Sequence, residues 1–313
     1  MSFFAILFAL LLEQARPLGS GNPVHAGLRG WVRWVMHNFD AGKSHHGGLV
    51  WGMTVGVPTL ATLLVHWLLL FTLGWFAAML WSVAILYISL GFRQFSHHFT
   101  EIRDALEAGD EDRARQLLAQ WRQIDAPDLS RAEIIRHVIE HSVLAAHRHV
   151  FGVLTWFSML AVLGLGPAGA VLYRFSEFVA RYWPHLNHGP QALPVSEAVQ
   201  DMAARAWRHV DWLPARITAL GFAVVGSFEE AIDSWRFHET HAVVDNDGVI
   251  LAATAGAIHV RLGGTDSPLA QDPGASWQEP ELGHLRSIVG LVWRSVVMWM
   301  VLLALLTLAR LLG

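Results

Sequence analysis

Leu49 to Phe71 reads LVWGMTVGVPTLATLLVHWLLLF, and Trp75 to Phe92 reads WFAAMLWSVAILYISLGF. Both stretches are predominantly apolar, and each is close to the roughly 20 residues that a helix needs to cross a bilayer. Only a short turn around Gly74 separates them. The two stretches therefore predict a transmembrane helical hairpin over residues 48–92, with both of its ends on one side of the membrane.

The composition of the whole chain points to the same class of protein. The 313 residues are 53% hydrophobic and only 15% charged, and the mean hydropathy is +0.37. These values lie beyond those of an ordinary soluble domain, so they predict an all-α, polytopic helical membrane protein. The net charge of −4 gives no signal for a nucleic-acid partner. The absence of cysteine excludes disulfides, thiolate metal ligands and cysteine nucleophiles.

We expect a single membrane-embedded domain over residues 1–313, built from consecutive segments with different hydrophobic patterns. The expected segments are an N-terminal apolar helix and loop (1–47), the hairpin (48–92), a soluble helical insertion (93–149), a transmembrane helix (150–173), an amphipathic region (174–286) and a last transmembrane helix (287–309). Basic residues flank the hairpin on both sides, including Arg33 and Arg103. By the positive-inside rule, these flanks lie in the cytoplasm of a multi-pass protein of the bacterial inner membrane.

The insertion at 93–149 carries clear helix signals. Ile102 and Leu106 recur at helical spacing, and Gly109-Asp110 indicates a turn between two helices. Ser130 followed by Glu133 is typical of a capping box that opens a third helix. We therefore expect three amphipathic helices in this segment.

The amphipathic region contains the stretch Asp211-Trp212-Leu213-Pro214-Ala215-Arg216. Proline is tolerated in the first turn of a helix, so Pro214 predicts the start of a short apolar helix over 214–228. Arg216 would then face the membrane boundary or a buried anion. Further on, residues 243–264 are expected to hold short irregular or strand segments, with Asn246-Asp247-Gly248 as an alternative turn signal.

Two blocks of sequence resemble the cobinamide-phosphate synthase (CobD/CbiB) family. The first is DWLPARIT at 211–218, followed by GSFEEAI at 226–232, and the second is AATAGAIHVRLGG at 252–264. The insertion also follows the family's order of residues, from Ala105-Leu106 through Gly109-Asp110 and Asp125 to Glu140. Two ordered blocks at compatible spacing form a specific match.

The resemblance implies a membrane-embedded step of cobalamin assembly, in which the carboxylate of adenosylcobyric acid forms an amide bond with aminopropanol or its phosphate. Such a ligase would need a cationic pocket for phosphate and carboxylate groups, and carboxylates to manage the amine proton. The matched catalytic candidates are Asp125, Glu140, Asp211 and Glu229. The candidate ligand-binding residues are Arg148, Arg216, Asn246, Gly248, Arg261, Gly263 and Gly264. The expected partners are membrane lipid and a corrinoid or other anionic small molecule, with ATP and Mg²⁺ as cofactors of an active synthase and an oligomer left open.

A non-enzymatic alternative comes from the same resemblance. Positions where the synthases carry acids and amides hold other residues here, namely Leu144, Ala145, Arg148, Glu177 and Ala180. Arg148, eight residues before Trp156, and the DWLPAR stretch are similar to AmpE-type inner-membrane proteins linked to β-lactamase regulation. The alternative is therefore a sensor or modulator with a degenerate catalytic site.

The spacing of His137, Glu140 and His141 is similar to that of a zinc-binding motif. The pattern H-x-x-E-H puts two imidazoles one turn apart on a helix beside a carboxylate. A catalytic zinc site also needs a third protein ligand, and none is identifiable in the sequence. We therefore predict no metal site.

Overall fold

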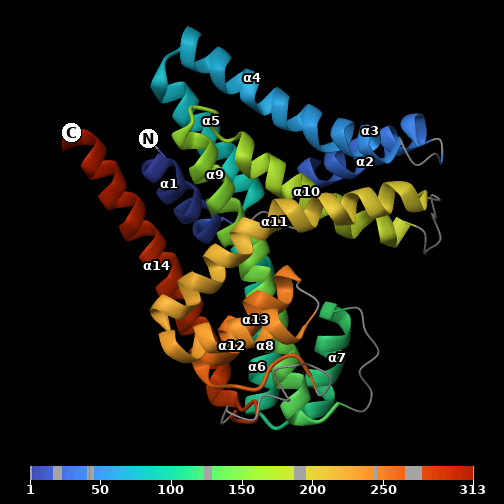
Figure 1. The fold of residues 1–313 in the computed structure, drawn as a ribbon, viewed down its shortest axis with the longest axis vertical. Coiled ribbons are helices and arrows are strands. Elements are labelled where there is room, and N and C mark those ends of the chain that lie inside the picture. The colour runs from blue at the N-terminus through green and yellow to red at the C-terminus, as the bar shows by residue number, and fades with distance from the viewer. Residues whose placement is uncertain are drawn as a thin grey trace. The chain divides into compact units, whose positions relative to one another are not determined.

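The computed structural model describes residues 2–16, 23–40, 42, 46–122, 129–186, 195–242, 245–264 and 277–312, and within them every regular element is a helix (Figure 1). The chain divides into two compact units. Unit 1 comprises Met1–Gly91 with Arg148–Pro214, and unit 2 comprises Phe92–His147 with Ala215–Gly313.

The hairpin predicted from the two apolar stretches is present in unit 1. Helix α3 (His46–Trp51), a π-helical turn η1 (Gly52–Gly56) and α4 (Val57–Thr72) form one continuous helical stretch. Gly74, at φ 85°, turns the chain into α5 (Trp75–Ser89), which packs on α4. In the part of the chain that the structure describes, two helices are long and apolar enough to cross a membrane, His46–Thr72 and Leu282–Ala309. The shorter α5 is also apolar.

The N-terminal part of unit 1 contains more helix than expected. The apolar start forms α1 (Ser2–Ala15), which packs on α5. The prediction of a loop through residue 47 was wrong, because α2 (Pro23–Phe39) lies there. Its residues Val32, Val35 and Met36 recur at helical spacing and are buried. They pack in a core with Trp183 and neighbouring residues of α10 and α11, and this burial stabilises the helix.

The transmembrane helix expected at 150–173 is divided in two. Helix α9 (Gly152–Val162) ends before a turn, and α10 (Ala168–Leu186) begins after it. Gly164 and Gly166 in this turn have positive φ angles of 77° and 56°, a conformation that glycine adopts without strain. The two helices then pack closely, since a Cβ on Gly169 would overlap the carbonyl of Trp156.

Helix α11 (Glu197–Val225) corrects the prediction of a helix that starts near Pro214, because the proline lies inside a longer helix. A proline in a helix interior leaves the carbonyl four residues earlier without its N–H donor. That carbonyl belongs to Val210, and the indole Nε1–H of Trp156 donates to it at 2.8 Å. The same device occurs at Pro58, where Trp31 Nε1–H donates to the Thr54 carbonyl at 3.1 Å.

Unit 2 contains the three amphipathic helices predicted for the insertion. They are α6 (Phe92–Glu107), α7 (Glu111–Arg122) and α8 (Arg131–Ala146). Gly109, at φ 77°, makes the turn between the first two. The capping box is confirmed, because the Ser130 hydroxyl accepts from the Glu133 N–H and the Glu133 carboxylate accepts from the Ser130 N–H.

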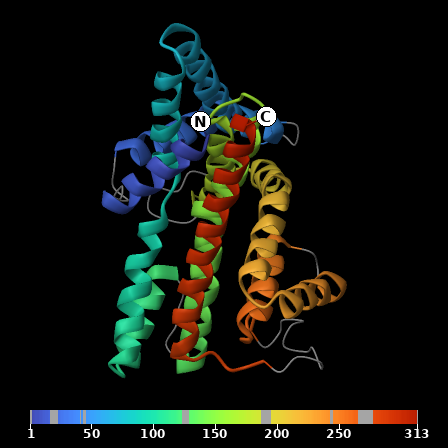
Figure 2. The same cartoon turned by 90° about the vertical axis from the view of Figure 1, so that its left-hand side faces the viewer.

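The rest of unit 2 is α12 (Phe228–His241), α13 (Asn246–Ile258) and α14 (Leu282–Leu312). The strand segments expected over 243–264 are replaced by α13, which begins because the Asp245 side chain caps the Gly248 N–H at 3.0 Å. Extended pairing in the described residues is limited to one isolated bridge between Val260 and Gln278. Helix α14 confirms the last apolar helix and packs along α8 (Figure 2), and its Arg294 is exposed.

Candidate functional site

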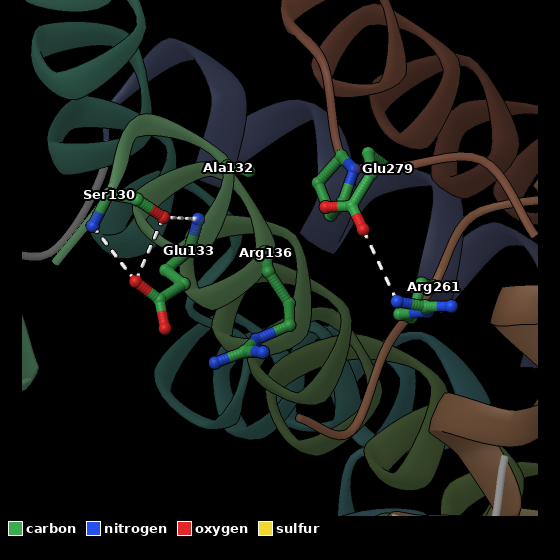
Figure 3. Close-up of a pocket in the computed structure, with 7 residues that line it drawn as sticks. Ser130, Ala132, Glu133, Arg136, Arg261 and Glu279 are labelled. Carbon is green, nitrogen blue, oxygen red and sulfur yellow. Dashed lines mark hydrogen bonds and ion pairs between the residues drawn. The ribbon is translucent and has the colours of Figure 1, made fainter. Parts of the chain in front are cut away.

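A cavity of about 350 Å³ lies in unit 2 between the start of α8 and the chain on either side of the Val260–Gln278 bridge. Its lining residues are Ser130, Ala132, Glu133, Arg136, Arg261, Glu279 and Pro280 (Figure 3). The bridge fixes one wall, because the Arg261 N–H donates to the Gln278 carbonyl at 2.9 Å and the Gln278 N–H donates to the His259 carbonyl at 3.1 Å. We call this cavity the Arg136–Arg261 pocket.

Two guanidinium groups face the pocket, and they differ in their burial and in their ion-pair partners. Arg261 forms an ion pair with Glu279 at 3.2 Å, and both side chains are largely exposed. Arg136 has a side chain that is only 16% exposed, and its buried Nε has no hydrogen-bond partner. Arg136 therefore brings a largely buried positive charge to the pocket wall, with its Nε on the side of Glu140.

The carboxylate of Glu133 serves the local structure. It accepts the Ser130 N–H at 2.9 Å and the Ser130 hydroxyl at 2.8 Å. These hydrogen bonds lower the pKa of Glu133, first that from the Ser130 backbone and then that from its side chain. Glu133 therefore stays ionised as the cap of α8.

Glu140 lies one turn beyond Arg136 and contacts the family segment that ends in Gly263-Gly264. The Gly263 N–H donates to Glu140 Oε1 at 2.8 Å, and Arg136 Nε lies 3.7 Å from the same oxygen. Burial acts to raise the pKa of Glu140, but His137, the Gly263 N–H and Arg136 outweigh it and leave the pKa below its usual value. Gly263 and Gly264 have φ angles of 89° and 73°, so this turn requires glycine.

The predicted ligand-binding residues do not form a single pocket. Arg261, Gly263 and Gly264 follow the C-terminal end of α13, whereas Asn246 and Gly248 lie at its N-terminal end. Thirteen helical residues at a rise of about 1.5 Å each separate the two ends by about 20 Å. The candidate residues between 246 and 264, which were expected to form one site, therefore lie at the two opposite ends of α13.

Arg216 belongs to the N-terminal end of α13. It donates to the Asn246 side-chain carbonyl at 3.3 Å and to Glu239 at 3.2 Å. Nearby, a Cβ on Gly248 would overlap the buried ring of His238. Arg216 thus joins α11, α12 and α13, a role that stabilises the fold whether or not a ligand binds there.

Two of the remaining candidates are buried in unit 1. The hydroxyl of Tyr173 donates to Asp211 Oδ1 at 2.8 Å, and both side chains are fully buried. Arg148 is also buried, with 7% of its surface exposed. A buried carboxylate that is hydrogen-bonded to a buried tyrosine is well suited to holding helices together, and α10 and α11 are linked in this way.

The other candidates are less informative. Glu229 is exposed in the first turn of α12, and Asp125 lies outside the described residues. His141 packs edge-to-face on Trp121, while His137 Nδ1 lies 2.6 Å from the Arg122 guanidinium. No group of three metal-ligand side chains occurs among the residues that the structure describes, and the expectation that the protein needs no metal stays a prediction.

Arg136 is the pocket residue that the sequence reasoning missed. The signal available for it was its spacing, since Arg136 and Glu140 lie four residues apart on a predicted helix and so share a face. That pattern is common on solvated helices. It gains weight here only because Gly263, which is far away in sequence, meets the same carboxylate.

The fold and pocket define a helical protein with long apolar helices and a cavity lined by two arginines and two glutamates, which lies beside a glycine turn. The family model described as CobD/Cbib protein matches residues 3–292, and the chain belongs to this family. The cobalamin biosynthesis protein CobD of Stutzerimonas stutzeri is 30% identical over 317 residues, which cover 96% of each chain. The protein of the same name from Chromobacterium violaceum is 34% identical over 58% of this chain and 55% of its own.

The cobalamin biosynthesis protein CobD of Leptospira interrogans is 30% identical over 62% of this chain and 60% of its own. No solved structure matches the chain significantly. Nothing in these comparisons supports the AmpE-type alternative. The chain is therefore a member of a family of cobalamin biosynthesis proteins.

Proposed function

We propose that the protein is a membrane-embedded ligase that joins the carboxylate of adenosylcobyric acid to the amine of aminopropanol or its phosphate. Membership of the CobD/CbiB family supports the pathway. The observation that carries the step is the Arg136–Arg261 pocket, where two guanidinium groups and the carboxylates of Glu133 and Glu279 line one cavity beside the family's glycine turn. Guanidinium groups bind carboxylate and phosphate in bidentate geometry, and both substrates of this reaction can carry such groups.

The residues around the pocket would bind and orient the substrates. Arg261 is preorganised at its backbone by the Val260–Gln278 bridge, and its exposed guanidinium pairs with Glu279. Preorganised charges of this kind lower the cost of bringing an amine and a carboxylate together. Amide formation from a free carboxylate also needs activation, and we propose ATP with Mg²⁺ as its source, without residues assigned to it.

The proposed location is the bacterial inner membrane, with several membrane passes. The helices His46–Thr72 and Leu282–Ala309 support it by length and composition. Large apolar side chains on the hairpin are also strongly exposed, including Phe71 at 82% and Leu73 at 69%. Exposed apolar surface of this extent is costly in water and is favourable in a lipid bilayer.

Complementation tests this function. The wild-type gene should restore cobalamin-dependent growth to a bacterial strain that lacks its own cobinamide-phosphate synthase. Arg261→Ala should abolish the rescue, because it removes a charged wall of the pocket. Arg286→Ala is the matched control, since Arg286 is an exposed arginine of unit 2 that pairs with the surface carboxylate of Glu107. A well-expressed wild type that fails to rescue would refute the proposal.

Arg216→Ala belongs in the same experiment, because it reports on the other end of α13. Rescue by Arg216→Ala together with failure of Arg261→Ala would assign the chemistry to the Arg136–Arg261 pocket. The reverse result would assign it to the cluster of Arg216, Asn246 and Glu239. Membrane fractions should be blotted for each variant, so that loss of growth is compared at equal amounts of protein.

A further inference from the structure

The carboxylate of Glu140 is engaged by groups from two separate parts of unit 2. Oε1 accepts the Gly263 N–H at 2.8 Å and lies 3.7 Å from Arg136 Nε. Oε2 lies 3.5 Å from His137 Nδ1. The side chain is only 13% exposed, and it is absent from the pocket lining to which Arg136 belongs. Glu140 therefore stands behind the pocket wall, in contact with the groups that form it.

This geometry is unsuited to proton transfer with a substrate. A general base must reach the proton that it removes, directly or through one water, and Glu140 does not line the pocket. His137 offers no relay to the pocket either, because its Nδ1 lies between Glu140 and Arg122 and the residue is absent from the pocket lining. The lowered pKa of Glu140 agrees with a carboxylate that stays ionised.

The geometry is well suited to fixing the position of Arg136 relative to the Gly263–Gly264 turn. One oxygen of Glu140 faces both the Arg136 guanidinium and the backbone of the glycine turn. That turn approaches Arg136 closely, since a Cβ on Gly264 would lie 3.7 Å from Arg136 Nη1. Arg136 Nε keeps no hydrogen-bond partner of its own in this arrangement. Glu140 thus faces the buried Nε side of the guanidinium, so contact with a ligand would fall to the terminal nitrogens of Arg136.

We propose that Glu140 is a positioning residue, which holds Arg136 and the Gly263–Gly264 turn, and that Arg136 contacts an oxyanion of the substrate. The inference rests on the proposed function and adds to it the residue that binds the anion and the residue that sets its geometry. The oxyanion is either the phosphate of aminopropanol phosphate or a carboxylate of the corrinoid. Both are recognised by the same guanidinium chemistry.

Steady-state kinetics on protein purified in detergent test the proposal. The rate of amide formation is measured while aminopropanol phosphate, aminopropanol and adenosylcobyric acid are varied in turn. The variants are Arg136→Lys, Glu140→Gln and Glu140→Ala, and Glu107→Gln is the control because Glu107 forms an exposed pair with Arg286. Glutamine can still accept the Gly263 N–H but has no charge to orient Arg136.

Arg136→Lys should raise KM about ten-fold or more for one substrate, with a much smaller change in kcat. An effect confined to aminopropanol phosphate assigns the phosphate, and an effect on adenosylcobyric acid assigns the carboxylate. Glu140→Gln should raise the same KM to a lesser extent, and Glu140→Ala should raise it further because the turn is also released. In Glu140→Gln combined with Arg136→Lys, the increases in KM should not multiply, since both act through one contact.

Two results would overturn the proposal. A fall of 100-fold or more in the kcat of Glu140→Gln, with KM unchanged and one limb of the pH–rate profile lost, would make Glu140 a proton-transfer residue. Unchanged KM values in Arg136→Lys would remove Arg136 from the substrate site. Failure of the proposed function is separate and visible, because wild type and Glu107→Gln would then form no product.

Discussion

Replacement of Trp156 by phenylalanine tests how α11 runs through Pro214. The change removes the indole N–H that donates to the Val210 carbonyl at 2.8 Å. This hydrogen bond is partly buried, and a carbonyl withdrawn from water without a donor costs about 1–3 kcal/mol. The smaller ring adds a packing loss, so Trp156→Phe alone should destabilise the protein by more than this contribution.

A double-mutant cycle with Pro214→Ala separates the two contributions. The alanine supplies a backbone N–H that can donate to the Val210 carbonyl along the helix, so the indole is no longer needed there. In that background Trp156→Phe should cost only the packing loss. The expected coupling free energy is therefore about 1–3 kcal/mol.

The cycle is measured by equilibrium chemical unfolding of the four purified proteins in detergent, followed by far-ultraviolet circular dichroism. An equal cost of Trp156→Phe in both backgrounds would refute this account of Pro214. The pair of Trp31 and Pro58, which meets at the Thr54 carbonyl at 3.1 Å, offers a second cycle with the same expectation.

Three further predictions concern unit 2. Gly256→Ala should destabilise the protein by about 1–3 kcal/mol, because the new Cβ would overlap the Glu230 carbonyl, whereas Gly290→Ala, with open space around its Cβ, should be neutral or stabilising in the same unfolding assay. Ser130→Ala should cost about 1 kcal/mol of stability as the capping box is lost, and Ser130→Gly only a few tenths. The Glu140→Gln variant should be less stable than wild type by a constant amount above pH 4.5, the ordinary pKa of the carboxyl group. As the pH falls through the lower pKa of the folded state, wild type loses this advantage and the difference should vanish. A pH series of thermal melts of both proteins would show this.

Much of the fold follows from local sequence signals. The hairpin was predictable because two apolar stretches flank a single glycine turn at Gly74. The capping box at Ser130 and the turn at Gly109 were predictable because their signals involve residues only three or four positions apart. These features depend on interactions between residues that are close in the sequence, which a local pattern can specify.

The failures share a physical cause, which is a partner far away in sequence. Pro214 stays inside α11 because Trp156 supplies the missing donor, and no local pattern at residues 211–218 contains that tryptophan. Residues 246–258 become a helix whose Gly256 packs directly against α12. Only part of the pocket could be predicted from the sequence, for the same reason. Arg261 and Gly263 were found from the family resemblance, whereas Arg136 becomes notable only where the Gly263 N–H meets Glu140.

Product analysis tests the central claim most directly. Membranes that contain the wild-type protein are incubated with adenosylcobyric acid, ATP, Mg²⁺ and either aminopropanol or aminopropanol phosphate, and the corrinoids are analysed by mass spectrometry. We predict an amide-linked product from one of the two amines in wild-type membranes, and none with Arg261→Ala at equal protein level. Adenosylcobyric acid recovered unchanged from wild-type membranes with both amines, while a characterised family synthase forms product in parallel, would contradict the account.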